Sequence, residues 1–365
     1  MIPQPPRLAA VAGAFPPNYY DQDTLIAAFR REWAARHYNL DRIEQLHRNV
    51  LVGGRHLALP LEDYGRLQSW GQANDAWIGA ALDVGERAVR AALECARLDV
   101  AEVDALFFVT VTGISTPSLD ARLMNRLRLP SRVRRVPIFG LGCLAGAAGV
   151  ARASDYVRAY PRQVAVLLSV ELCSLTLQRE DLSIPNLIAT GLFGDGAAAA
   201  VIVGGERRAA GEEGDNEAGP RWPQVLATNS VFYPDSEEVM GWSISERGFK
   251  VVLSADVPKV VQEHLAHDVD AFLSGQGLTR ADIAAWIAHP GGPKVLEAVQ
   301  QALDLPPAAL ETSWRSLREV GNLSSTSVLL VLDEVMRERT PAPGQYGLMF
   351  AMGPGFCSEL VLLRW

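Results

Sequence analysis

Short apolar runs alternate with amphipathic stretches along this chain. The apolar runs predict buried strands, because a continuous run of this kind is typical of a strand covered on both faces. They are Ala105–Val111, Val164–Val170, Ala197–Val203, Trp286–Ala288, Gly347–Met352 and Leu360–Leu363. Between them, apolar residues have helical spacing at Val84–Leu98, Ala145–Tyr156, Val257–Leu273, Lys294–Leu303 and Ser325–Arg337. This alternation predicts a layered α/β fold.

A charged, Gly-rich stretch without apolar periodicity, Gly204–Pro223, interrupts this pattern. Such a composition is typical of a surface crossing, and 365 residues exceed what one compact core usually holds. We therefore expect two halves, residues 1–205 and 206–365. Each half contains a strand that ends in a turn and opens a helix, at Val136–Cys143 and at Trp286–Pro293. This correspondence suggests an internal duplication.

Composition excludes several classes of protein. The chain has 34 Lys and Arg against 42 Asp and Glu, which is not the basic excess of a nucleic-acid binder. The N-terminus lacks the pattern of a secretory signal. The longest apolar-leaning run, Val136–Ala151, is too short to span a membrane and predicts buried core. We expect a cytoplasmic protein that binds neither nucleic acid nor membranes.

The cysteines Cys95, Cys143, Cys173 and Cys357 occur singly, a spacing that favours neither a disulfide framework nor a zinc site. Cys143 has a distinctive context, because it follows a predicted strand and Gly142 and precedes a helix of small residues. A thiol at a helix N-terminus has a lowered pKa, so this context predicts a nucleophile. We expect Cys95 and Cys357 to lie in the core.

His289 ends the apolar run Trp286–Ala288 and precedes a Pro-Gly-Gly-Pro turn. This position places an imidazole at a strand end, where sites in α/β folds assemble. The other histidines have charged or helical contexts and are predicted to be solvated: His37, His47, His56, His264 and His267.

Asn322 precedes the predicted helix Ser325–Arg337, a position that suits an N-cap as well as a functional residue. Together with Cys143 and His289 it completes the residue types of covalent acyl transfer. Papain-like proteases use the same types, but a Gly-rich turn in a buried layered fold favours a different acyltransferase.

Five motifs resemble, in order and spacing, those of the type III polyketide synthases, the chalcone synthase superfamily. They are Gly142-Cys143, Leu192–Gly196, Trp286–Pro293, Gly321–Ser325 and Met352–Gly355. Ketoacyl-ACP synthase III enzymes share some of them, but the His-Pro-Gly-Gly-Pro and Gly-Pro-Gly elements together favour type III. The resemblance implies a thiolase fold with duplicated halves in five αβαβα layers, a homodimer, acyl-CoA and malonyl-CoA as substrates, and no metal or redox cofactor.

The resemblance also implies roles. Cys143 would carry the acyl starter as a thioester, and His289 would stabilise its thiolate as an imidazolium. His289 and Asn322 would then hold the thioester oxygen of malonyl-CoA during decarboxylation. Phe193 matches the gatekeeper aromatic between the CoA tunnel and the cavity. The second gatekeeper position falls at Val251, so that side of the gate is expected to be wider.

Several cavity positions depart from the plant enzymes. Trp242 stands where they have Gly, and its indole is expected to fill the end of the main cavity. Cys173, close to Thr176, replaces a cavity-wall Thr, as in bacterial relatives with a side tunnel for long acyl chains. Before Gly353 and Pro354 the chain reads Ala-Met instead of Gly-Phe, which changes the loop that shapes cyclisation.

Two further sets of residues bear on the substrate and the product. Arg48, Arg55 and Lys294 are candidates to bind CoA phosphates. Val111 stands where aldol-forming relatives keep a hydroxyl in a network with Glu171 and Ser324. Its apolar side chain favours lactonisation to a pyrone.

The sequence thus predicts an enzyme that extends a medium- or long-chain fatty acyl-CoA with malonyl-CoA and releases an alkylpyrone or alkylresorcinol. The alternatives are a malonyl-primed tetrahydroxynaphthalene synthase, a condensing enzyme like ketoacyl synthase III, and an inactive homologue that serves as a scaffold.

Overall fold

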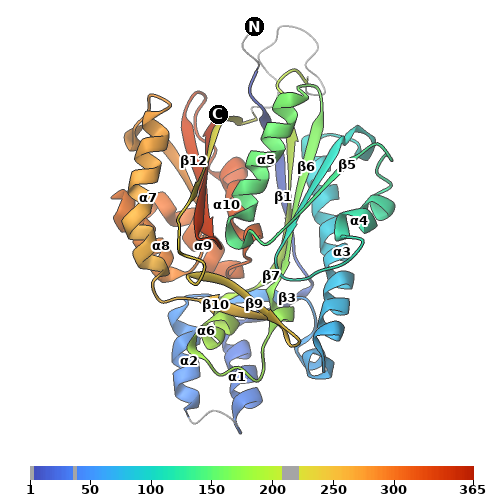
Figure 1. Ribbon diagram of the computed structural model, residues 1–365, viewed down its shortest axis with the longest axis vertical. Helices are drawn as coiled ribbons and strands as arrows, with labels where there is room; N and C mark the ends of the chain where they lie inside the picture. The colour runs from blue at the N-terminus through green and yellow to red at the C-terminus, as the bar shows by residue number, and fades with distance from the viewer. Residues whose placement is uncertain (1–3, 36–38, 208–221) are drawn as a thin grey trace.

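A mixed β-sheet runs through the computed structural model, which describes residues 4–35, 39–207 and 222–365 (Figure 1). In these residues the sheet has nine strands in the order β11-β12-β13-β8-β1-β7-β6-β4-β5. The first half of the chain supplies β1 (Arg7–Ala14), β4 (Ala105–Thr110), β5 (Arg134–Phe139), β6 (Val164–Leu172) and β7 (Asp195–Val203). The second half supplies β8 (Gln224–Phe232), β11 (Ile283–Ala288), β12 (Tyr346–Gly353) and β13 (Cys357–Arg364).

The two halves repeat one topology. In the first, β1 pairs antiparallel with β7, β7 antiparallel with β6, and β6 parallel with β4. In the second, β8, β13, β12 and β11 follow the same antiparallel, antiparallel, parallel sequence. A single residue pair, Arg7 with Gln224, joins the halves between β1 and β8. This repetition confirms the predicted duplication.

Helices lie on both faces of each half-sheet, which gives the five predicted αβαβα layers (Figure 1). Helix α3 (Trp70–Ala96) packs on the outer face of the first half against β1, β6 and β7. Helices α5 (Ala145–Ala159) and α10 (Ser325–Glu338) lie between the halves, and each contacts strands of both. Helices α7 (Val257–Ser274) and α8 (Pro293–Leu303) share a core cluster with β11, β12 and β13.

Most predicted elements are confirmed, with bounds that differ by a few residues, except that α3 begins at Trp70 and not at the predicted Val84. One burial prediction is wrong: the apolar run that begins at Val136 is buried only from Gly142 onward. Its first part is β5, one of the two edge strands of the sheet in the described residues, where Phe139 is 46% exposed. Two of the central strands, β1 and β8, were not predicted at all.

The remaining elements surround the lower end of the sheet or connect its strands. They are β2 (Asn18–Asp21), β3 (Gly54–Leu57), β9 (Met240–Ser245), β10 (Gly248–Leu253), α1 (Gln22–Trp33), α2 (Leu40–Asn49), α4 (Leu119–Leu127), α6 (Ile184–Leu192), α9 (Glu311–Val320), and the short 3-10 helices η1 (Leu61–Arg66), η2 (Val100–Glu102), η3 (Gly142–Leu144), η4 (Cys173–Thr176), η5 (Arg280–Asp282) and η6 (Pro307–Leu310). Most of the expected crossing at 204–223 lies outside the described residues, which omit 208–221. No helix among the described residues is long and apolar enough to cross a membrane.

Several side chains are not buried or exposed as predicted. Cys95 is exposed on α3 and Cys357 is half-buried, so neither is a core residue. His47 is fully buried, with its Nε2 3.1 Å from the carbonyl oxygen of Leu187, and burial lowers its pKa to about 3.

The other histidines are more accessible. His267 is exposed as predicted, whereas His56 and His264 are half-buried against aromatic rings. His37 lies outside the described residues.

Candidate active site

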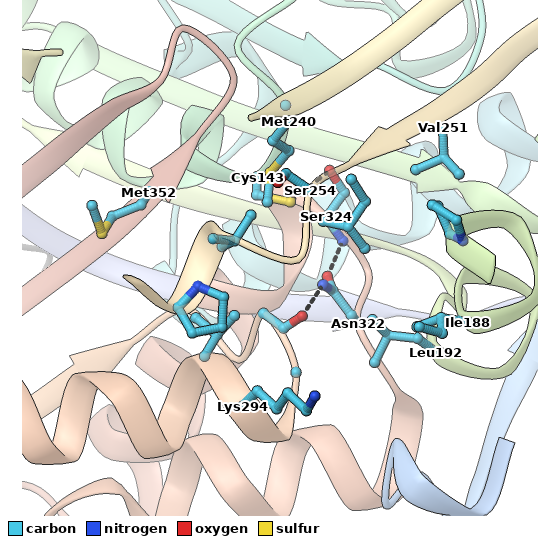
Figure 2. Close-up of a pocket in the computed structure, with 18 of the residues that line it drawn as sticks. Cys143, Ile188, Leu192, Met240, Val251, Ser254, Lys294, Asn322, Ser324 and Met352 are labelled. Carbon is cyan, nitrogen blue, oxygen red and sulfur yellow. Dashed lines mark hydrogen bonds between the residues drawn. The ribbon is translucent and has the colours of Figure 1, made fainter. Parts of the chain in front are cut away.

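Cys143, His289 and Asn322 line one cavity of about 470 Å³, although they come from three distant segments. Figure 2 shows this cavity with Cys143, Asn322 and Ser324 around it. Its other walls are mostly apolar and include Ile188, Leu192, Met240 and Val251. The segments after β5 and β11 and the connection between α9 and α10 thus bring the predicted catalytic residues together.

Cys143 lies in η3, in a turn that tight packing holds in place. Gly142 has φ +54°, and a Cβ there would lie 2.7 Å from the ring of Pro354. Behind the same turn, a Cβ on Gly353 would lie 2.9 Å from the backbone nitrogen of Leu144. Pro354 lines the cavity, but Gly353, predicted to bind substrate, is not among its lining residues and instead lets β12 pack against the turn.

The Cys143 thiol is 8% exposed, and its Sγ donates to Ser324 Oγ at 3.7 Å. Burial raises its pKa to about 12; the Ser324 hydroxyl acts in the opposite direction, and the nearby Glu171 raises the pKa further. The prediction that the helix N-terminus lowers the pKa of Cys143 is therefore wrong for the free enzyme, because desolvation of the thiolate outweighs the effect of the helix.

His289 follows β11, where its backbone N–H donates to the carbonyl oxygen of Phe350 at 3.0 Å. The imidazole is 7% exposed, and neither ring nitrogen has a hydrogen-bond partner among the described residues. Burial lowers the pKa of His289 to about 3. Because burial disfavours either charge alone, a proton that moves from Cys143 to His289 leaves two opposite charges that stabilise each other.

Backbone and side-chain hydrogen bonds hold Asn322 in place. Its N–H donates to Leu192 O at 3.0 Å and its carbonyl accepts from Gly194 at 3.0 Å. Its Oδ1 accepts from the Ser324 N–H at 2.8 Å and its Nδ2 donates to Gly291 O at 3.1 Å (Figure 2). The second N–H of the amide remains available to a substrate oxygen.

A second cavity, of about 640 Å³, meets the first at Phe193, Trp242 and Val251. Cys173 and Thr176 line only this second cavity, where a side tunnel was predicted to begin. Trp242 therefore lies between two cavities instead of closing the end of one. It pairs with Val251 across β9 and β10, so both residues belong to the same wall.

The three candidate CoA ligands have different surroundings. Lys294 is exposed at the rim of the first cavity. Arg48 is exposed but paired with Glu44 and Asp23 at 2.9 and 3.0 Å. Arg55 is 1% exposed, so its predicted role as a surface phosphate ligand is wrong.

The hydrogen bonds of the buried Glu171 carboxyl, beside the cavity, differ from the network with Ser324 that the resemblance implied. Glu171 is 0% exposed and accepts from the Val111 N–H at 3.1 Å, from the Thr112 hydroxyl at 2.8 Å and from the Ser325 hydroxyl. Burial raises its pKa to about 7. With the Thr110 hydroxyl, which donates to the same carboxyl at 3.4 Å, the network retains three hydroxyls despite the apolar side chain of Val111. Ser324 bonds with Cys143 instead.

Two family models together match most of the sequence. Residues 5–207 match the N-terminal domain, and residues 224–365 the C-terminal domain, of chalcone and stilbene synthases. The chain belongs to the chalcone and stilbene synthase family. It is a type III polyketide synthase with the thiolase fold, a condensing acyltransferase, as the motifs predicted.

The synthase resembles several bacterial proteins over nearly its whole length. It is 50% identical to a 1,3,6,8-tetrahydroxynaphthalene synthase of Streptomyces peucetius subsp. caesius, over 98% of this chain and 93% of that protein. It is 38% identical to a putative chalcone synthase of Bacillus subtilis strain 168, over 90% of each chain. The crystal structure of the tetrahydroxynaphthalene synthase of Streptomyces coelicolor A3(2) matches with a TM-score of 0.90 at 30% identity, over 98% of this chain and 99% of that one.

Proposed function

We propose that the synthase builds a polyketide on Cys143 by decarboxylative condensation of malonyl-CoA, with His289 and Asn322 as its other catalytic residues. One observation carries this proposal: a thiol, an imidazole and an amide N–H converge on one buried cavity with apolar walls. Each is a group that acyl transfer and carbanion stabilisation require. We further propose that Lys294, which is exposed and lines the cavity, binds a CoA phosphate.

Loading begins when the proton of Cys143 moves to His289. The thiolate attacks the carbonyl carbon of the acyl-CoA, a new C–S bond forms, and the bond to CoA breaks. The departing CoA thiolate takes the proton from the imidazolium and leaves as the free thiol. The water-poor cavity protects the resulting thioester from hydrolysis.

Extension uses the same groups on malonyl-CoA. His289, now neutral, and the Nδ2 of Asn322 donate hydrogen bonds to the thioester oxygen, where negative charge accumulates when the C–C bond to carbon dioxide breaks. The enolate carbon then attacks the thioester on Cys143, and the C–S bond breaks. The thiolate left on Cys143 attacks the extended CoA thioester, and the bond to CoA breaks. The CoA thiolate takes a proton from water as it leaves, and the next round begins.

We further propose that malonyl-CoA also primes the enzyme and that the product is a tetrahydroxynaphthalene. Support comes from the relative of that name, which is 50% identical over 98% of this chain. The second cavity beyond Phe193 and Trp242 adds room for a chain that grows past the first cavity. A second candidate is a fatty acyl-CoA starter with an alkylpyrone or alkylresorcinol product, which the apolar lining of the first cavity favours.

A starter ladder separates the two candidates. Purified synthase is incubated with malonyl-CoA alone and with each acyl-CoA from acetyl to stearoyl, and products are identified by mass spectrometry. We expect an aromatic product from malonyl-CoA alone that is absent with Cys143→Ala. Alkylpyrones or alkylresorcinols that form only with long starters would instead establish the second candidate.

We also propose that the synthase is a homodimer. The free edge of β5 exposes unpaired backbone groups next to apolar side chains, among them Phe139. An exposed apolar edge of this kind pairs readily with another strand, and a second copy of the chain offers an identical one.

A further inference from the structure

Arg55 lies on the wall of the second cavity with part of its hydrogen-bonding capacity unused. One amino group of the guanidinium donates to the carbonyl oxygen of Thr190, in the last turn of α6. Among the described residues, neither Nε nor Nη1 of Arg55 has a hydrogen-bond partner. Buried donors without partners cost free energy. The side chain is therefore suited to an oxygen atom that enters the cavity.

The carboxylate of Asp195 does not accept a hydrogen bond from Arg55. It acts on Arg55 through space, but its oxygens accept hydrogen bonds from the backbone of Ala58 and from the backbone and hydroxyl of Ser174. Burial lowers the pKa of Arg55 to about 10, so the guanidinium stays protonated at neutral pH. The Arg55 guanidinium on the cavity wall is therefore a cation with N–H donors that have no partner among the described residues.

The second cavity connects this cation to the nucleophile. It meets the catalytic cavity at the wall that contains Phe193 and Trp242. Arg55 and Trp242 both line the second cavity, and Trp242 also lines the first, together with Cys143. A chain that is bound to Cys143 and passes this wall therefore extends toward Arg55.

We propose that Arg55 binds an oxygen atom at the distal end of the acyl chain on Cys143, a carboxylate or a β-keto carbonyl, and so selects oxygenated chains over alkyl chains. The inference rests on the proposed function, because a malonyl-primed chain carries such oxygens. A guanidinium matches a carboxylate with two parallel hydrogen bonds, whereas an alkyl chain leaves its buried N–H groups unpaired.

The test compares two series of starters with equal carbon numbers. Acyl-enzyme formation on Cys143 is followed by intact-protein mass spectrometry with ω-carboxyacyl-CoAs from malonyl to suberyl and with alkanoyl-CoAs from propanoyl to octanoyl. We expect the wild type to prefer the carboxylated starter at one or more lengths. Arg55→Met should lower that preference about tenfold or more, the effect of losing a charge-assisted hydrogen bond, and Arg55→Lys should lower it less. Arg90→Met, at an exposed position on α3, is the matched control and should not change it.

A second variant covers the case in which Arg55→Met fails to fold. Ala189→Leu narrows the second cavity from α6 and leaves the bond between Arg55 and Thr190 in place. Among the longer starters, Ala189→Leu should reduce the preference for carboxylated over alkyl chains. A wild type without preference, or an unchanged ratio in these variants, would refute the role of Arg55. Equal loss of both series in Arg55→Met, with no change of ratio in Ala189→Leu, would show a purely structural role.

The product assay keeps this outcome separate from that of the proposed function. If malonyl-CoA alone yields no aromatic product while Arg55→Met still shifts the ratio, the malonyl-primed product is wrong and the selection by Arg55 stands. If the aromatic product forms and the ratio does not shift, the malonyl-primed product stands and the selection by Arg55 is wrong.

Discussion

The Cys143 thiol and the His289 imidazole each lie in surroundings that disfavour a single charge, so each makes the other reactive. With His289→Gln the proton acceptor is lost, and the thiol keeps the pKa of about 12 that burial, as the largest cause, gives it. We therefore expect alkylation of Cys143 by iodoacetamide to slow about tenfold or more at neutral pH and to recover as the pH rises toward that value. Peptide mass spectrometry reads the rate, and the exposed Cys95 is the internal control. An unchanged rate for Cys143 would show that His289 does not ionise it.

Asn322 should act after loading. Asn322→Ala removes the free N–H that faces the malonyl thioester oxygen, and losing one such donor typically lowers the rate by about 10²–10³-fold. We expect acyl-Cys143 to form at the wild-type rate while condensation with malonyl-CoA slows to that degree. Single-turnover mass spectrometry separates the two steps. Equal loss of both would instead indicate that the substitution disturbs the Phe193–Asn322 bridge.

Glu171 should make stability depend on pH. Its pKa is 4.5 when solvated and about 7 in the fold, so the folded state binds this proton more tightly than the unfolded state does. The resulting stability, on the order of 3 kcal/mol, is present below about pH 4.5 and is lost as the pH rises through 7. Compared with Glu171→Gln, the wild type should therefore lose melting temperature between pH 5 and pH 8. The exposed control Glu94→Gln should follow the wild type, and parallel curves for Glu171→Gln would contradict the assignment.

The close contact between the central helices α5 and α10 depends on one glycine. A Cβ on Gly146 would lie 2.2 Å from the carbonyl oxygen of Ser325 and 2.7 Å from Val328. Gly146→Ala should therefore destabilise the protein and displace the Ser324–Ser325 segment beside Cys143, although alanine favours a helix. Gly79→Ala on α3 meets nothing within 4 Å and should instead stabilise the protein by about 0.5–1 kcal/mol. Thermal unfolding of both variants tests this: the melting temperature should fall for Gly146→Ala and rise for Gly79→Ala.

The sequence predicted the strands with long runs of apolar residues and missed two strands whose residues have lower β-propensity. Strands β6 and β7 are buried along their whole length, and their apolar runs indicate as much. Strand β1 is rich in Ala and Gly, and β8 is largely half-exposed and polar, so neither has a strand-like pattern despite a central position.

The candidate site shows the same division. Local context identified Cys143 and His289 as candidates, because each lies next to a Gly-rich turn at the end of a predicted strand. Asn322 became a candidate only in combination with these two residues. Arg55 and His47 were expected at the surface because of their polarity. Their partners Thr190 and Leu187 lie 135 and 140 residues away, so no local pattern indicates that they are buried.

For the whole molecule, the exposed edge of β5 makes oligomeric state the property to test. Phe139 is 46% exposed there, and a charge at this position would have to be desolvated in an interface between two copies. We expect Phe139→Asp to shift the protein from dimer to monomer in light scattering, with its fold retained. Phe232→Asp is the control, because Phe232 is 60% exposed on β8, inside the sheet order and away from its free edge. A monomeric wild type would refute the dimer, whereas a dimer that persists in Phe139→Asp would place the interface on another face.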